Sequence, residues 1–166
     1  MEQLDQTGRP GYRHALQAIG HYFDQQLYRG IFVAEIDDGY IGKARSAHED
    51  AELYAEGFSF PHDDVQALID SPLTGENAPI DGPPHCPYGY GLFMQAVGEL
   101  CDRHEASYVS VLEVTNGFVL CYTVDAAPTR DSGRRLGGRR NEPRAERRRF
   151  VLDRVGIEEL MNSTLD

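Results

Sequence analysis

The chain contains one short sequence pattern twice. VAEIDDGYIGKA occupies residues 33–44, and VLEVTNGFVLCY occupies residues 111–122, which lie 78 positions further on. When residues 15–44 are aligned with residues 93–122 at this offset, seven of the thirty pairs are identical. Similarity at a fixed offset is typical of chains that are built from repeated structural units. The sequence therefore predicts a fold made of two similar halves.

Each copy begins with a predicted amphipathic helix. Apolar residues recur every three or four positions from Tyr12 to Phe23 and again from Tyr90 to Cys101, a spacing that puts them on one helix face. Gly20 and Gly98 lie in the middle of these helices, where glycine costs about 1 kcal/mol relative to alanine. We expect both glycines to allow close packing of a helix on a sheet.

A β-hairpin is predicted after each helix. Residues 31–37 and 108–115 are rich in β-branched and aromatic side chains. Asp38-Gly39 and Asn116-Gly117 follow them, and these dipeptides are preferred in two-residue type I′ turns. A hairpin is therefore expected at the same place in both copies.

A third strand and a short helix complete each copy. FSFPHDDVQALI, from Phe58, resembles FVLDRVGIEELM, from Phe150. The offset has grown from 78 to 92 residues, so the second copy carries an insertion of 14 residues before its third strand. The insertion falls in an Arg-rich stretch at about residues 130–147.

These elements predict an α+β fold of two tandem αβββα repeats. Repeat one covers residues 11–70, a Pro-rich connecting loop covers residues 71–90, and repeat two covers residues 91–163. Each repeat supplies a three-stranded antiparallel sheet with packed helices, which is marginal on its own. We therefore expect one pseudo-twofold-symmetric domain over residues 1–166. Whether the repeats share a single sheet stays open.

The predicted turns sort the hairpin residues into two faces. With Asp38-Gly39 as the loop, Glu35 pairs with Gly42. One face of each hairpin is then mostly aliphatic and is expected to lie under its helix. This face holds Phe32, Ala34, Ile36, Ile41 and Lys43 in the first hairpin and Ser110, Leu112, Val114, Val119 and Cys121 in the second.

The other face combines a glutamate with an aromatic residue in both hairpins: Glu35 with Tyr40, and Glu113 with Phe118. One interpretation is an ordinary solvated sheet face. Another is a surface for a partner protein, a second copy or a small ligand. A catalytic carboxylate pair would also require a cleft and separated pKa values. Our leading hypothesis is a non-catalytic protein-binding or adaptor module that acts through these four residues.

The Arg-rich segment suggests an alternative function. The net charge is −11, yet nine of the sixteen basic side chains lie in residues 130–149. Guanidinium clusters suit phosphate, so the alternative is a protein associated with nucleic acid or another polyanion. The segment lacks aromatic residues that could stack on bases, and a solvated loop or a contact with an acidic protein remains open. The residues of this alternative are Arg134, Arg135, Arg139, Arg140, Arg147, Arg148 and Arg149.

Metal and cofactor chemistry is not predicted. His85-Cys86 and Cys101-x-x-His104 could on paper supply four zinc ligands. However, Cys101 falls on the apolar helix face, where a cysteine usually acts as a small hydrophobic residue. No Walker-type loop, GxSxG or HExxH sequence occurs. This disfavours enzymes with short signatures and leaves other enzymes open.

The sequence also predicts a soluble cytoplasmic protein. No apolar run approaches the roughly 20 residues that cross a bilayer, so no membrane partner is expected. Three cysteines are too few for a disulfide framework, which favours a reducing compartment.

Overall fold

The fold is α+β, with four helices and one six-stranded antiparallel sheet in the part that the structure describes. The computed structural model describes residues 10–26, 28–46, 55–70, 86, 88–125 and 145–164. The first half contains α1 (Tyr12–Gln25), β1 (Tyr28–Ile36), β2 (Gly39–Ser46), β3 (Ala55–Pro61) and α2 (His62–Asp70). The second half contains α3 (Gly89–Arg103), β4 (Ser107–Val114), β5 (Gly117–Asp125), β6 (Ala145–Asp153) and α4 (Arg154–Thr164).

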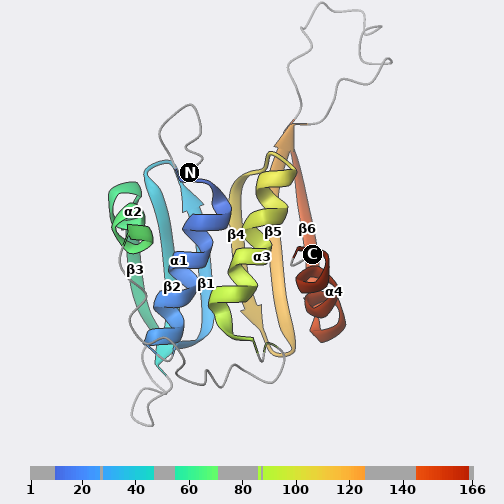
Figure 1. The fold of residues 1–166 in the computed structure, drawn as a ribbon, viewed down its shortest axis with the longest axis horizontal. Helices are drawn as coiled ribbons and strands as arrows, with labels where there is room; N and C mark the ends of the chain where they lie inside the picture. Colours follow the sequence, from blue (N-terminus) through green and yellow to red (C-terminus); the bar gives the residue numbers. More distant parts are fainter. Residues whose placement is uncertain are drawn as a thin grey trace, which may run out of the picture.

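All six strands belong to one sheet, in the order β3-β2-β1-β4-β5-β6 (Figure 1). The two halves join where β1 pairs with β4, and Val33 lies opposite Val111 at the centre of this pair. The predicted hairpins are confirmed as β1–β2 and β4–β5. The predicted third strands with their short helices are also confirmed, as β3–α2 and β6–α4. The two halves therefore share a single sheet.

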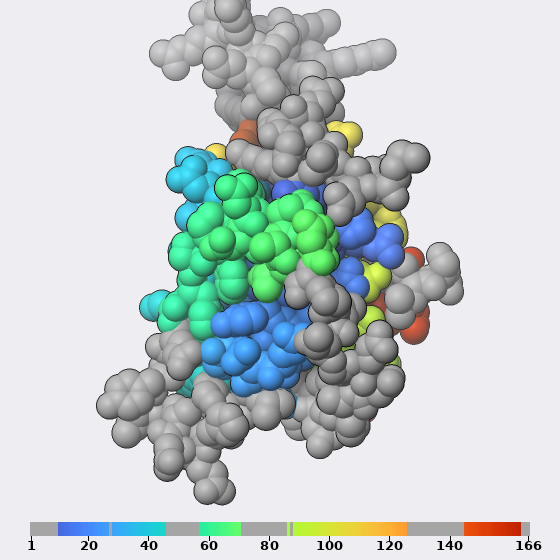
Figure 2. All heavy atoms as spheres, turned by 60° about the vertical axis from the view of Figure 1, so that its left-hand side comes forward, coloured from blue at the N-terminus to red at the C-terminus, as the bar shows by residue number. Residues whose placement is uncertain are grey.

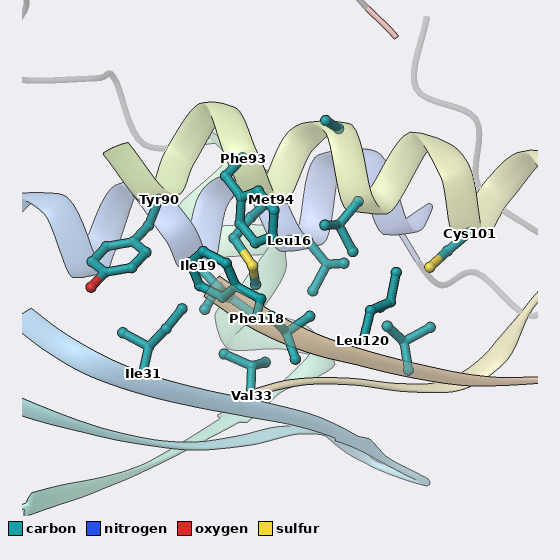
Figure 3. Close-up of a cluster of buried hydrophobic side chains, with 14 of the residues drawn as sticks. Leu16, Ile19, Ile31, Val33, Tyr90, Phe93, Met94, Cys101, Phe118 and Leu120 are labelled. Carbon is teal, nitrogen blue, oxygen red and sulfur yellow. The ribbon is translucent and has the colours of Figure 1, made fainter. Parts of the chain in front are cut away.

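Helices cover one face of this sheet. Helices α1 and α3 lie side by side in opposite directions across the central strands, with α2 and α4 near the two sheet edges (Figure 1). Figure 2, turned toward the β3 edge, shows α2 lying against β3 and beside α1. The core fills the space between the two long helices and the strands, where Leu16, Ile19, Phe93 and Phe118 are almost fully buried (Figure 3). None of the described helices is both long and apolar enough to cross a bilayer.

The two mid-helix glycines have a packing role, but between helices and not against the sheet. A Cβ atom on Gly20 would lie 2.6 Å from the carbonyl oxygen of Tyr90, at the start of α3. A Cβ atom on Gly98 would lie 2.4 Å from the carbonyl oxygen of Tyr12, at the start of α1. The expected helix-on-sheet contact was wrong, because the helix backbones touch each other at these two points.

The predicted turns were displaced by one residue. Ile36 pairs with Gly39, so the two-residue loop of the first hairpin is Asp37-Asp38 and not Asp38-Gly39. Glu35 therefore pairs with Tyr40 and not with Gly42. The second hairpin shows the same displacement, with Val114 opposite Gly117.

The glycine after each turn is explained by the third strand. A Cβ atom on Gly39 would lie 2.1 Å from the carbonyl oxygen of Phe60 in β3. A Cβ atom on Gly117 would lie 2.0 Å from the carbonyl oxygen of Leu152 in β6. Each glycine thus starts the second strand of its hairpin and lets the third strand approach, which is a different requirement from a type I′ turn.

The predicted residue sets of the two hairpin faces are correct, but their orientation was wrong. The face with the glutamates points toward the helices, where Tyr40 is 2% exposed and Phe118 is 0% exposed. The aliphatic face points away from the helices and carries Ile36, Ile41, Leu112 and Val114, all 37–43% exposed. Because the sheet is apolar on both faces, alternation alone did not reveal which one the helices cover.

Candidate functional site

The aromatic members of the predicted site are core residues. The ring of Phe118 stacks on that of Phe93, with centroids 4.0 Å apart. Tyr40 lies against the ring of His62, at the start of α2, with centroids 6.4 Å apart. The structure therefore places Tyr40 and Phe118 beneath helices and not on an open surface.

The carboxylate of Glu113 links a helix to the neighbouring strand. Its Oε1 accepts a hydrogen bond of 2.7 Å from the hydroxyl of Tyr90, on α3. The same oxygen accepts a bond of 3.0 Å from the backbone N–H of Ile31, on β1. Burial and the adjoining carboxylate raise the pKa of Tyr90, so its hydroxyl remains a donor over the ordinary pH range.

Glu35 makes the corresponding contacts from the other strand. Its Oε1 accepts a bond of 2.7 Å from the hydroxyl of Tyr12, on α1, and one of 3.2 Å from the backbone N–H of Val109, on β4. Burial, followed by the bond to Glu35, raises the pKa of Tyr12 as well. Both glutamates are half-buried, and these contacts account for them as groups that fasten helix and sheet together.

Irregularities in the two central strands explain why these N–H groups need a side-chain acceptor. The register of β1 shifts between Arg29 and Phe32, and that of β4 shifts between Ser107 and Ser110. Ile31 and Val109 lie within these shifts, where regular ladder bonds are interrupted. An interior N–H without a partner is costly, so each glutamate completes the hydrogen bonding of the opposite strand.

A pair of aspartates caps the two long helices across their interface. Asp24, near the end of α1, accepts bonds of 2.9 Å from the N–H groups of Tyr90 and Gly91 at the start of α3. Asp102, near the end of α3, accepts bonds of 2.9 and 3.0 Å from Tyr12 and Arg13. Carboxylates are favourable at helix N-termini. Burial raises the pKa of Asp24, although its two backbone hydrogen bonds act in the opposite direction.

Tyr12, Tyr90, Asp24 and Asp102 were not predicted as partners in these contacts. A signal was present, because Asp24 and Asp102 are identical at the offset of 78 and a tyrosine begins each helix pattern. The pairing itself could not be predicted, since it depends on α1 and α3 lying antiparallel.

Among the described residues, Cys86, Cys101 and His104 do not form a metal-binding cluster. Cys86 is buried, and burial raises the pKa of its thiol to about 12. Cys101 is also buried, with its pKa raised for the same reason, whereas His104 is exposed. His85 lies outside the described residues, within which no three His, Cys, Asp or Glu side chains are grouped to hold a metal ion.

The arginines of the alternative function fall into two groups. Arg134, Arg135, Arg139 and Arg140 lie outside the described residues. Arg147, Arg148 and Arg149 lie on β6.

These three β6 arginines differ in their contacts. Arg147 reaches across the sheet and donates to the carbonyl of Tyr108, to Oγ1 of Thr123 and to Oγ of Ser110. Arg148 lies 4.0 Å from a carboxylate oxygen of Glu146. Arg147 is therefore engaged with its own sheet.

The sheet face that the helices leave uncovered is a candidate binding surface that crosses all six strands. We call it the open sheet face. Cross-strand pairing aligns its residues in two adjacent rows that cross all six strands. The first row is Gly57, Lys43, Phe32, Leu112, Val119 and Val151, and the second is Ser59, Ile41, Ala34, Ser110, Cys121 and Arg149.

The open sheet face carries accessible apolar side chains from β2 to the edge strand β6. Leu112 is 43% exposed, Ile41 is 39% exposed and Val151 is 67% exposed. The half-exposed thiol of Cys121 lies among them. Exposed apolar side chains that gather on one face often mark an interaction site.

No family model, no curated protein and no solved structure matches this chain.

Proposed function

We propose that the chain is a non-catalytic protein-binding or adaptor module, built from two copies of an αβββα unit, whose partner docks on the open sheet face. The observation that carries the proposal is the set of exposed aliphatic side chains (Ile36, Ile41, Leu112, Val114 and Val151) on the sheet face opposite the one that the helices cover. Sheets that are apolar on both faces normally have a layer packed on each.

Several contacts support the duplication, because they recur at the offset of the sequence repeat. The bond from Tyr12 to Glu35 corresponds to the bond from Tyr90 to Glu113. The pairing of β1 with β4 is centred on Val33, which lies opposite its counterpart in the repeat.

The backbone contacts of the two long helices also recur at the offset of the sequence repeat. The caps made by Asp24 and Asp102, and the close approaches at Gly20 and Gly98, are also reciprocal. A pseudo-twofold axis through the centre of the β1–β4 pair would produce all of these pairs.

The buried network argues for placing the partner on the open sheet face rather than around the glutamates. Glu35 and Glu113 already accept hydrogen bonds from a tyrosine and a backbone N–H each. A partner at Tyr40 or Phe118 would have to displace the helices above them. A partner on the opposite face would cover Ile41, Leu112 and Val151 without disturbing any described helix.

The proposal places the protein in the cytoplasm, in keeping with its three unpaired cysteines. Self-association is an alternative on the same face, and a small ligand is a weaker one because the face crosses all six strands. Association with a polyanion through the arginines remains the alternative of a different class.

A matched pair of leucine substitutions tests the proposal. Leu112 on the open sheet face is 43% exposed, and Leu92 on the outer side of α3 is 41% exposed. We expect affinity co-purification from the native host to retain a protein with the wild type and with Leu92→Glu, and to lose it with Leu112→Glu. A charge introduced into an apolar contact is costly to bury.

Nuclease treatment separates the two classes of function in the same experiment. A protein that is retained despite nuclease, and lost only with Leu112→Glu, supports the binding module. Docking on the open sheet face would be contradicted if both leucine variants retained the same protein, or if nuclease treatment abolished its retention.

A further inference from the structure

The open sheet face differs in charge from the rest of the protein. Lys43 and Arg45 project from β2 on this face, and Arg147 and Arg149 project from β6. The chain as a whole carries a net charge of −11. This face is therefore a basic region on an acidic protein.

The carboxylates on the same face lie at its periphery. By the alternation of side chains along each strand, Asp125 and Asp153 lie on the same face as these cations. They are, however, the last residues of β5 and β6. Oδ1 of Asp153 accepts a hydrogen bond of 2.8 Å from the N–H of Gly156 in α4. Asp37 lies in a turn and accepts a bond from the hydroxyl of Tyr108. The two central rows contain cations and no carboxylate.

Lys43 and Arg149 border the apolar centre from opposite sides. Both are exposed, and neither forms a salt bridge with another described residue. Four strand spacings separate β2 from β6, which corresponds to about 19 Å at roughly 4.8 Å per spacing. Between them lie the side chains of Phe32, Leu112 and Val119.

We propose that the partner on the open sheet face is an amphipathic α-helix of another protein, with an apolar face flanked on both sides by carboxylates. This inference rests on the binding module proposed above. A helix is about 10–12 Å across with its side chains. It therefore fits between Lys43 and Arg149 along the central strands, and the long cationic side chains can reach its flanks.

The length of the central strands sets the length of the helix. β1 has 9 residues and β4 has 8, so the face extends for about 30 Å along them at roughly 3.3 Å per residue. A helix of about 18–20 residues covers that distance at 1.5 Å per residue. Its contacts would be apolar side chains at i, i+3, i+4 and i+7, with Glu or Asp on both sides.

Charge disfavours a second copy in this position. Two open sheet faces packed together would bring Lys43 and Arg149 of one copy against the cations of the other, and like charges across an interface are costly. Nucleic acid is also a poor fit, because its affinity depends on many phosphate contacts. The centre of the face, with Phe32, Leu112 and Val119, is apolar and offers no cation to a phosphate.

A displayed library of random peptides of about 18 residues provides the probe. The library is selected on the wild-type full chain at low salt, and enriched peptides are then measured on Leu112→Glu, on Lys43→Glu/Arg149→Glu and on Leu92→Glu. We expect acidic amphipathic sequences that bind wild type and Leu92→Glu alike. They should lose binding to Leu112→Glu and bind the charge-reversed variant about tenfold more weakly. High salt should weaken them as well.

The outcomes separate this inference from the proposed function. Peptides that need Leu112 but lack carboxylates, or that bind the charge-reversed variant equally well, would contradict an acidic helix as the partner. The proposed function, docking on the open sheet face, would still hold. If no peptide depends on Leu112, both proposals fail. A dimer of the free chain that Leu112→Glu dissociates would show that a second copy occupies the face, which also overturns the inference. The melting temperature of each variant confirms that it is folded.

Discussion

The hydroxyl of Tyr90 donates a hydrogen bond of 2.7 Å to Oε1 of Glu113, and this bond ties α3 to the central strand pair of the sheet. Tyr12 and Glu35 form the equivalent bond between α1 and the sheet. In each case the same carboxylate oxygen also accepts the N–H of a residue in the opposite strand. The glutamates of the repeated pattern thus act on helix packing and strand pairing at once.

Removing either glutamate should destabilise the fold. Glu35→Ala and Glu113→Ala each leave a tyrosine hydroxyl and a backbone N–H without this acceptor, and the loss should be about 1–3 kcal/mol for each variant. Denaturant unfolding measures it. Glu159→Ala, at an exposed position of α4, is the control and should stay within about 0.5 kcal/mol of wild type. Equal effects at all three positions would contradict the structural role of Glu35 and Glu113.

The mid-helix glycines should not tolerate a methyl group. Gly20→Ala and Gly98→Ala gain about 1 kcal/mol of helix propensity, but each new Cβ atom would lie under 3 Å from the backbone of the other long helix. We expect a net loss of about 1–3 kcal/mol from overpacking. Gly57→Ala in β3 is the control, because nothing lies within 4 Å of its added Cβ atom. An increase in stability for Gly20→Ala would show that the helices are farther apart than described.

Asp24 should give stability a defined dependence on pH. Its pKa is raised by burial in the folded protein, whereas an unfolded aspartate titrates near pH 3.9. Between these two values the folded state holds the proton more tightly, so this contribution is complete below about pH 3.9 and is lost as pH rises through the folded pKa. The free energy of unfolding, measured across this pH range, should fall with rising pH in the wild type. The Asp24→Asn variant should not show this fall. An identical slope in the variant would contradict the assignment.

The three thiols should differ in reactivity. Cys86 and Cys101 are fully buried, and burial raises the pKa of both, which keeps them in the unreactive thiol form. Cys121 is half-exposed on the open sheet face. A disulfide exchange reagent at mildly alkaline pH should therefore modify Cys121 in the native protein and the other two only after unfolding. Rapid labelling of Cys101 in the native state would contradict its place in the core.

Much of the fold could be predicted from residue patterns. The periodicity of Tyr12–Phe23 and of Tyr90–Cys101 predicted α1 and α3, and the glycine dipeptides predicted two hairpins in the right places. The register was displaced because Gly39 is required by the approach of Phe60 rather than by the turn. A sequence read along one hairpin contains no information on a third strand at that distance.

The orientation of the sheet could not be predicted for a physical reason. Ile36, Ile41 and Leu112 looked like core residues, and Glu35 and Glu113 looked like solvated ones. The strand irregularities at Ile31 and Val109 interrupt the ladder of hydrogen bonds, and the interior N–H groups of these residues therefore need a side-chain acceptor. The glutamates face inward because they supply it. The aliphatic residues are then left on the outer face, which is where the proposed binding surface lies.

The most direct test of this account compares the unfolding free energies of Phe118→Ala and Leu112→Ala. Phe118 is 0% exposed beneath the helices, and Leu112 is 43% exposed on the open sheet face. The account predicts a loss of about 3–5 kcal/mol for Phe118→Ala and of about 1 kcal/mol or less for Leu112→Ala. Equal losses, or a larger loss for Leu112→Ala, would mean that the aliphatic face is the core, and the open sheet face could then not be the binding surface.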